Sequence, residues 1–226
     1  MKNRQSLTLC ILLTLGLSYG IQASPTLTEK QPNKIDNINA ITHPQEGREY
    51  VTLANPLASQ PSVVEFFSFY CGPCYQFIEQ YPVAAAINRS LPDGNVIKYH
   101  VNAMGSLGNE LTEAWAIAIV MGKTDQVEKP LFEAIRNKKL NSIADIQSIF
   151  SQVGVDATTY EQSRQSLLVK GTVARQNTAI EAFAVTSTPS FYVNGKYQIN
   201  NSGVAATSPQ EYVDNFASVV HALLQK

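Results

Sequence analysis

The chain has 226 residues, of which 44% are hydrophobic and 15% charged. This composition is typical of a globular protein and excludes a disordered one. Its 17 basic and 18 acidic residues give a net charge of −1, and no basic stripe runs along it, so we do not expect nucleic acid as a partner.

The first 23 residues have the pattern of a secretory signal peptide. Lys2 and Arg4 precede an apolar stretch over 7–17, and Gly20 and Ala23 are small residues suited to cleavage. A retained membrane anchor is the less favoured alternative, because the apolar stretch is shorter than the roughly 20 residues that span a bilayer.

Removal of residues 1–23 changes both the charge and the cysteine content. The segment holds two of the 17 basic residues and none of the 18 acidic ones, so the mature charge becomes 15 − 18 = −3. It also holds Cys10, which leaves two of the three cysteines. Since disulfides persist outside the cytosol, we expect a soluble periplasmic or secreted protein.

The first half of the expected fold has a β-β-α-β order. Strands are predicted over 50–53 and 62–69, and the second is apolar enough for burial on both faces. A helix over 74–88 follows, with Pro82 expected to kink it. Alternating residues over 95–101 predict a third strand.

The residue pattern in the middle of the chain predicts helices. Apolar residues between 111 and 184 recur at the spacing of one helix face, and short breaks at Gly122, Asn141 and Gly154 separate the segments. We assign these apolar stripes to the core and to no cofactor.

Strand character returns near the C-terminal end. Extended stretches over 190–193 and 196–199 flank Asn194-Gly195, the strongest short signal for a hairpin with a type I′ turn. A helix over 208–224 closes the chain. The expected fold class is therefore α/β, with one domain split by an all-helical insertion.

The cysteine motif Cys71-Gly72-Pro73-Cys74 lies between the buried strand and the first helix. At a helix N-terminus, free N–H groups and the helix dipole favour an anion, so the pKa of the Cys71 thiol should be depressed. Cys74 lies one turn further and can leave or resolve a mixed disulfide. Pro73 suits the first helical turn.

Two other uses of this motif are weaker. A structural disulfide that closes so small a loop stabilises little. A zinc site normally needs four ligands, and His43, His100 and His221 are scattered along the chain without a second cysteine pair. No metal or other cofactor is expected.

Two further pairs carry chemistry. Thr188-Pro189 precedes the hairpin, where a proline belongs at a strand start, although general preferences do not assign a cis bond. Glu65 and Lys98 each interrupt an apolar strand, and a buried charge must pair or shift its pKa. A carboxylate near the inner cysteine could shuttle its proton, while Lys98 is long enough to reach solvent instead.

Beyond these motifs, the chain resembles the DsbA-type periplasmic thiol:disulfide oxidoreductases of the thioredoxin superfamily. The likeness spans nearly the whole mature chain and is densest over residues 64–69, 74–77, 98–102, 111–116 and 192–198.

The resemblance implies a thioredoxin fold with an inserted all-helical domain. Its thioredoxin domain would comprise residues 45–102 and 181–226, the helical domain residues 103–180, and an N-terminal arm residues 24–44. The implied activity is the introduction of disulfide bonds into exported proteins.

The resemblance also implies roles for single residues. Cys71 would be the exposed nucleophile and Cys74 the resolving thiol, with Thr188-Pro189 as the cis-proline loop that faces their disulfide.

Further implied features concern the surroundings and the partners. Glu65 and Lys98 would form a buried charged pair below Cys74, and Tyr212 would contribute to an apolar peptide groove. The substrates would be reduced exported polypeptides, and a DsbB-like, quinone-linked membrane protein would reoxidise a monomeric enzyme.

The chain departs from the family pattern at several positions. Gly72-Pro73 replaces the usual Pro-His, which removes a positive charge beside Cys71, so we predict a higher Cys71 pKa and a less oxidising couple. Thr188 replaces the common valine, and Ile78 stands where the family has an acid. A reductase or isomerase, or a peptide-binding chaperone without redox activity, therefore remain alternatives.

Overall fold

The computed structural model describes residues 40–91 and 94–226. The chain divides into two units, residues 1–36 and 37–226, and everything below concerns the second. The predicted signal peptide and most of the predicted arm therefore lie outside the described residues.

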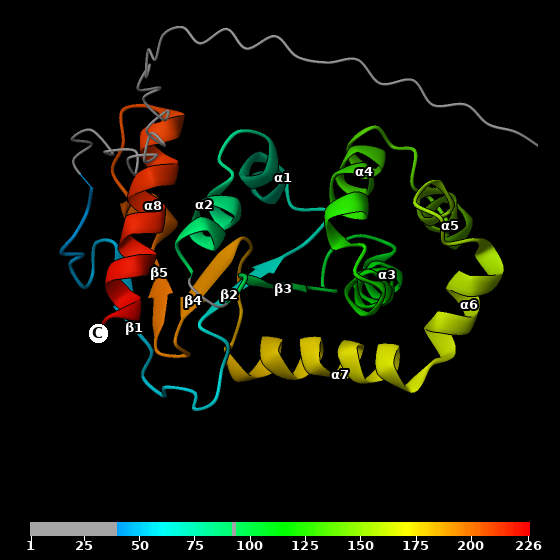
Figure 1. Cartoon of the computed structure of the whole chain (residues 1–226), viewed down its shortest axis with the longest axis horizontal. Helices are drawn as coiled ribbons and strands as arrows, with labels where there is room; N and C mark the ends of the chain where they lie inside the picture. Colours follow the sequence, from blue (N-terminus) through cyan, green and yellow to red (C-terminus); the bar gives the residue numbers. More distant parts are fainter. Residues whose placement is uncertain (1–39, 92–93) are drawn as a thin grey trace, which may run out of the picture. The chain divides into compact units, whose positions relative to one another are not determined.

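A five-stranded mixed sheet organises this unit (Figure 1). Strands β2 and β3 are parallel, and the other neighbours are antiparallel, in the order β1-β5-β4-β2-β3. All five strands were predicted, although each of them except β4 is shorter than expected. Their bounds are β1 Tyr50–Thr52, β2 Val63–Phe67, β3 Ile97–His100, β4 Ser190–Val193 and β5 Tyr197–Ile199.

Helices surround the sheet, and five of them follow one another between β3 and β4, where the three predicted breaks had divided an all-helical stretch into four segments. The described helices are α1 Gly72–Glu79, α2 Val83–Ser90, α3 Gly108–Met121, α4 Thr124–Arg136, α5 Ile143–Gln152, α6 Ala157–Gln165, α7 Leu167–Ala182 and α8 Pro209–Leu224, with a short 3₁₀ helix, η1, at Asn201–Gly203. This is the α/β thioredoxin fold with a helical insertion. The exact domain boundaries stay a prediction.

Two helix predictions were wrong in detail. The expected kinked helix over 74–88 is two helices, because Pro82 has no N–H to continue the ladder and lies just before α2. A break at Ser166 was missed. The Ser166 backbone is extended and its hydroxyl accepts a hydrogen bond from the Val169 amide at 3.2 Å, which ends α6 and caps α7.

The two faces of the sheet pack against different helices. Helices α2 and α8 cover one face, where Ile87 and Phe216 pack with Phe191. On the other face, Phe66 packs with Phe183, just after α7. The interior strand β2 is buried throughout, as its apolar sequence predicted.

The hairpin between β4 and β5 has the predicted turn. Asn194 and Gly195 have φ angles of 52° and 63°, the left-handed region that a type I′ turn requires. A Cβ on Gly195 would also clash with the Leu57 carbonyl oxygen. Only glycine therefore fits at this position.

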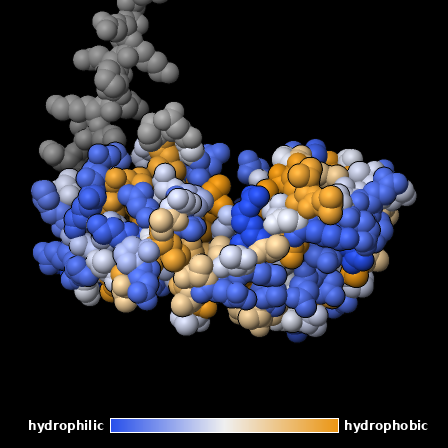
Figure 2. Space-filling model, turned by 90° about the horizontal axis from the view of Figure 1, so that it is seen from below, coloured by the Kyte–Doolittle hydropathy of each residue, from blue (hydrophilic) through white to orange (hydrophobic). Residues whose placement is uncertain are grey.

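The surface on the side of α7 is mostly polar, with separate hydrophobic patches (Figure 2). Leu167 and Leu168, at the start of α7, are the most exposed large apolar residues in the described part of the chain. Every helix in residues 40–91 and 94–226 is too short or too polar to cross a bilayer.

Candidate active site

Cys71 and Cys74 form a disulfide across the first turn of α1, with their Cα atoms 5.2 Å apart. Cys71 caps the helix with an extended backbone, and its Sγ accepts a hydrogen bond from the Cys74 amide at 3.1 Å. The Cys71 amide donates to the Ser68 carbonyl at 2.9 Å, which turns the chain from β2 into α1. The predicted position of Cys71 at the helix N-terminus is confirmed, so the helix dipole favours an anion on its sulfur.

A loop that is distant in sequence covers this sulfur. The Thr188–Pro189 peptide bond is cis, and the Thr188 carbonyl oxygen lies 3.3 Å from Cys71 Sγ. The expectation of an exposed Cys71 was wrong, because its exposed fraction is 4%, against 1% for Cys74. A partner must therefore approach Cys71 beside the Thr188 backbone.

Aromatic side chains form the base of the site. Phe69 packs with Trp115 and Phe132 at ring-centroid distances of 5.8 and 4.9 Å, in the same apolar cluster as both cysteines. Apolar surroundings disfavour a thiolate, so the amides at the start of α1 are the main stabilising groups for one.

The structure brings Glu65 and Lys98 together. They are opposite one another in the parallel register of β2 and β3, and Lys98 Nζ lies 3.3 Å from Glu65 Oε2. Burial raises the pKa of Glu65 and outweighs the opposing effect of Lys98. Burial acts to lower the pKa of Lys98, but Glu65 and Glu128 together raise it.

Glu128 on α4 was missed by sequence reasoning. Its carboxylate also pairs with Lys98 Nζ, so Lys98 lies between two acids. No sequence pattern links these residues, which are 30 positions apart and meet only because α4 packs near β3.

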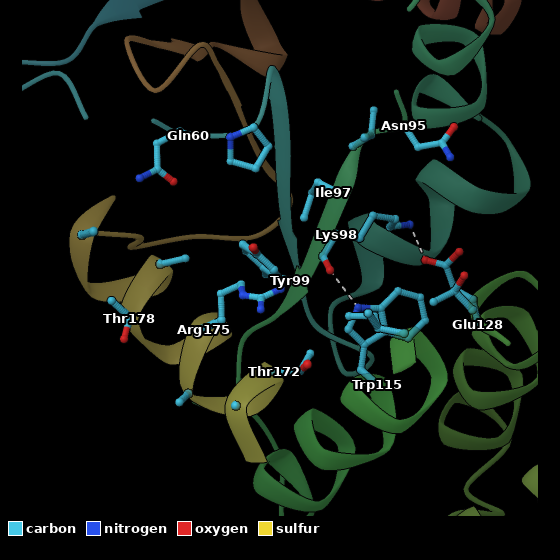
Figure 3. Close-up of a pocket in the computed structure, with 18 of the residues that line it drawn as sticks. Gln60, Asn95, Ile97, Lys98, Tyr99, Trp115, Glu128, Thr172, Arg175 and Thr178 are labelled. Atoms are coloured by element: carbon cyan, nitrogen blue, oxygen red, sulfur yellow. Dashed lines mark hydrogen bonds and ion pairs between the residues drawn. The ribbon is translucent and has the colours of Figure 1, made fainter. Parts of the chain in front are cut away.

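A cleft of about 880 Å³ borders this charged group (Figure 3). Lys98, Glu128, Trp115 and Arg175 are among its lining residues, and Trp115 Nε1 donates a hydrogen bond to the Lys98 carbonyl at 2.8 Å. Its lining, within the described residues, includes neither Cys71 nor Cys74. A position of the charged pair below Cys74 therefore stays a prediction.

Tyr212 lines a second cleft, of about 420 Å³, together with Phe77 of α1 and Tyr81. The rings of Tyr81 and Tyr212 lie 5.3 Å apart in an edge-to-face arrangement. Burial raises the pKa of Tyr212 to about 12, so its hydroxyl is a neutral donor. The aromatic lining suits an apolar side chain, and a role in peptide binding stays a prediction.

His100 is a second residue that sequence reasoning left aside. It is fully buried, and its ring stacks on Phe69 at 5.1 Å. Thr112 donates its hydroxyl hydrogen to the Gly108 carbonyl, so the 2.8 Å contact between Thr112 Oγ1 and His100 Nδ1 assigns the proton to Nδ1. In the part of the chain that is described, no three His, Cys, Asp or Glu side chains form a metal site.

Stability at acid pH is expected to depend on His100. Burial lowers its pKa from 6.5 to about 3, so the unfolded chain takes up a proton first as the pH falls. The free energy of unfolding should drop between these two values by about 1.4 kcal/mol per pH unit from this residue. Urea unfolding of His100→Gln should show a shallower decline than the wild type.

The control is His221→Gln, on the exposed surface of α8. Parallel pH profiles for the wild type and His100→Gln would contradict the assignment of this acid sensitivity to His100.

Residues 62–218 match the family model described as DSBA-like thioredoxin domain. The thiol:disulfide interchange protein DsbA of Salmonella typhimurium is 42% identical over 183 residues, which cover 80% of this chain and 88% of the relative. Among solved structures, the disulfide oxidoreductase DsbA from Proteus mirabilis has a TM-score of 0.78 and 39% identity, and covers 83% of this chain and 100% of its own. A complex of the same Proteus protein with the non-covalently bound peptide PWATCDS also has a TM-score of 0.78 and 39% identity, with 81% and 100% covered.

Proposed function

Because the chain belongs to the family of DSBA-like thioredoxin domains and is a protein thiol:disulfide oxidoreductase, we propose that it introduces disulfide bonds into exported polypeptides through Cys71 and Cys74. The observation that carries this proposal is the Cys71–Cys74 disulfide at the N-terminus of α1, with Cys71 Sγ accepting an amide hydrogen bond.

The proposed reaction consists of two thiol–disulfide exchanges. A substrate thiolate attacks Cys71 Sγ, a mixed disulfide forms, and Cys74 leaves as a thiolate that takes up a proton. A second substrate thiolate then attacks the substrate sulfur of that mixed disulfide and releases the Cys71 thiolate. The substrate loses two electrons and gains a disulfide, while the cysteine pair is reduced.

The position of Cys71 supports its role as the leaving thiolate. Its sulfur keeps the hydrogen bond from the Cys74 amide and the favourable end of the helix dipole. Stabilising this anion stabilises the reduced enzyme, which makes the disulfide a better oxidant.

Neighbouring residues would modulate the exchange. Gly72 and Pro73 form the first turn between the cysteines. Thr188 and Pro189 provide the backbone beside Cys71. We propose that a substrate peptide lies along this loop; the peptide bound to the related Proteus protein supports this.

Glu65, Lys98 and Tyr212 are proposed to act at a greater distance. Glu65 and Lys98 would exchange the proton that Cys74 gains or loses, since the carboxyl has a raised pKa and a cationic neighbour. Tyr212 would contribute an apolar wall for substrate side chains.

The second candidate function depends on a less oxidising redox potential of the cysteine pair, which the Gly72-Pro73 dipeptide favours. Neither residue brings a cation to the Cys71 sulfur, so the reduced form gains less stabilisation than it would with a charged histidine there. Under this alternative the protein would act as a reductase or isomerase.

The N-terminal sequence supports a proposal for the setting of the reaction. We propose export through the signal peptide of residues 1–23, action in the periplasm as a monomer, and reoxidation by a DsbB-like membrane protein. The redox centre would be the cysteine pair itself, without another cofactor.

Two measurements test the proposal together. Expression in an oxidase-deficient bacterial strain should restore motility or another trait that depends on disulfides. Equilibration of the purified protein with glutathione should show that its disulfide oxidises glutathione readily. Failure to complement despite full export, together with a thioredoxin-like equilibrium, would establish the reductive alternative.

A further inference from the structure

Asn201 connects the loop of Pro189 to the C-terminal helix. Its side-chain Nδ2 donates a hydrogen bond to the Pro189 carbonyl at 2.8 Å. Its own carbonyl accepts a hydrogen bond from the Tyr212 hydroxyl, on α8, at 2.9 Å. Asn201 is therefore the middle member of a chain of hydrogen bonds from the aromatic cleft to the cis-proline loop.

The loop that Asn201 holds is the one that covers the redox disulfide. Thr188, immediately before Pro189, has its carbonyl oxygen 3.3 Å from Cys71 Sγ. A rotation of the backbone at Pro189 would move this oxygen. The Asn201 side chain restrains that rotation by giving the Pro189 carbonyl a donor.

The turn that carries Asn201 is itself anchored from the other side. Asn200 Nδ2 donates to the Arg48 carbonyl at 2.7 Å, and the Asn200 amide donates to the Glu49 carbonyl at 2.8 Å. Gly203 packs against the same Arg48 carbonyl so closely that a Cβ would clash. The turn is thus fixed to the segment before β1 and forms a firm support for Asn201.

The side chain of Asn201 makes its hydrogen bond to Pro189. Its Oδ1 is buried and has no hydrogen-bond partner among the described residues, so Nδ2 makes the side chain's hydrogen bond. The Tyr212 hydroxyl, in turn, donates its hydrogen bond to the Asn201 carbonyl. The ring of Tyr212 can then face the 420 Å³ cleft as an apolar wall.

We propose that Asn201 is a positioning residue for disulfide exchange with polypeptides, which holds the Thr188-Pro189 backbone in place beside Cys71 through the Pro189 carbonyl. This inference rests on the proposed function. The inference predicts that losing the Asn201 side chain affects two kinds of substrate differently. A polypeptide joined to Cys71 must lie against the Thr188 backbone, whereas a small dithiol need not.

The test compares the oxidised wild type, Asn201→Ala and Ser202→Ala in single-turnover reactions. Ser202 is the control, because it lies in the same turn and, among the described residues, its hydroxyl bonds only Asn200. With a peptide that contains two cysteines, Asn201→Ala should react about five- to tenfold more slowly, the size expected for one lost hydrogen bond. With dithiothreitol it should stay within about twofold of the wild type, and Ser202→Ala should match the wild type with both.

Equal rates of Asn201→Ala and wild type with the peptide would overturn the inference. So would an equal slowing with peptide and dithiothreitol, which would indicate a general structural defect. Asn201→Leu is close in shape, adds no charge and lacks the Nδ2 donor, and gives the same comparison if Asn201→Ala does not fold.

Tyr212→Phe tests the connection to α8, because it removes only the hydroxyl. The double variant Tyr212→Phe/Asn201→Ala should react with the peptide no more slowly than Asn201→Ala alone, since both changes act through one path. Fully additive effects would overturn that path. A wild-type protein that failed to oxidise the peptide at all would instead refute the proposed function, and this inference with it.

Discussion

Cys71→Ser is expected to abolish disulfide transfer, with a loss of about a thousandfold or more in the rate of peptide oxidation. A serine oxygen forms no disulfide, so the variant lacks the Cys71–Cys74 bond, and the single thiol of Cys74 cannot take up the two electrons that the substrate loses. The measurement is the formation of the peptide disulfide, followed by mass spectrometry. The same variant should fail to complement an oxidase-deficient strain.

Cys74→Ser is the matched comparison, because it leaves the sulfur of Cys71 in place at the helix N-terminus. It should accumulate a mixed disulfide with a substrate that carries an activated disulfide, since no second thiol resolves the bond. If Cys71→Ser kept its biological effect, a chaperone function independent of redox chemistry would replace the present proposal.

Lys98→Met is expected to destabilise the protein by about 3–5 kcal/mol at neutral pH. The reason is that Glu65, with a side-chain exposure of 3%, would lose its cation and remain as a buried charge. Urea unfolding at pH 7 measures the loss. Glu128→Gln should cost less, about 1 kcal/mol or below, because Lys98 keeps Glu65 as its partner and no buried charge is left unpaired.

The double variant Glu65→Gln/Lys98→Met distinguishes the loss of the ion pair from the loss of side-chain packing at Lys98. It should recover most of the stability, since no buried charge is left. The pH dependence gives a second check. The folded-state pKa of Glu65 is raised, so the stability that Lys98→Met loses relative to the wild type should be smallest below about pH 4.5, where Glu65 is protonated in both states, and should grow as the pH rises. A loss independent of pH would contradict this explanation.

Local sequence patterns predicted most of the elements. The β-branched and aromatic residues over 62–69 identified the buried strand, and Asn194-Gly195 identified the hairpin turn. These signals work because backbone preferences depend on the residue itself and its near neighbours. The same locality explains the error at Pro82, where a break and a kink have the same sequence signature.

The order of residues along the chain is enough to specify the chemistry of the site: a cysteine pair, one turn apart, at the start of a helix that follows a buried strand. Sheet register also brought Glu65 opposite Lys98, both of which the sequence had singled out. The groups that meet these residues from distant parts of the chain are set by packing in three dimensions. Glu128 reaches Lys98, the Thr188 carbonyl covers Cys71, and Asn201 holds Pro189. Cys71 and Thr188 are 117 residues apart, and Lys98 and Glu128 are 30 apart. Such contacts depend on how helices and loops pack around the sheet, a property that no short window of sequence contains.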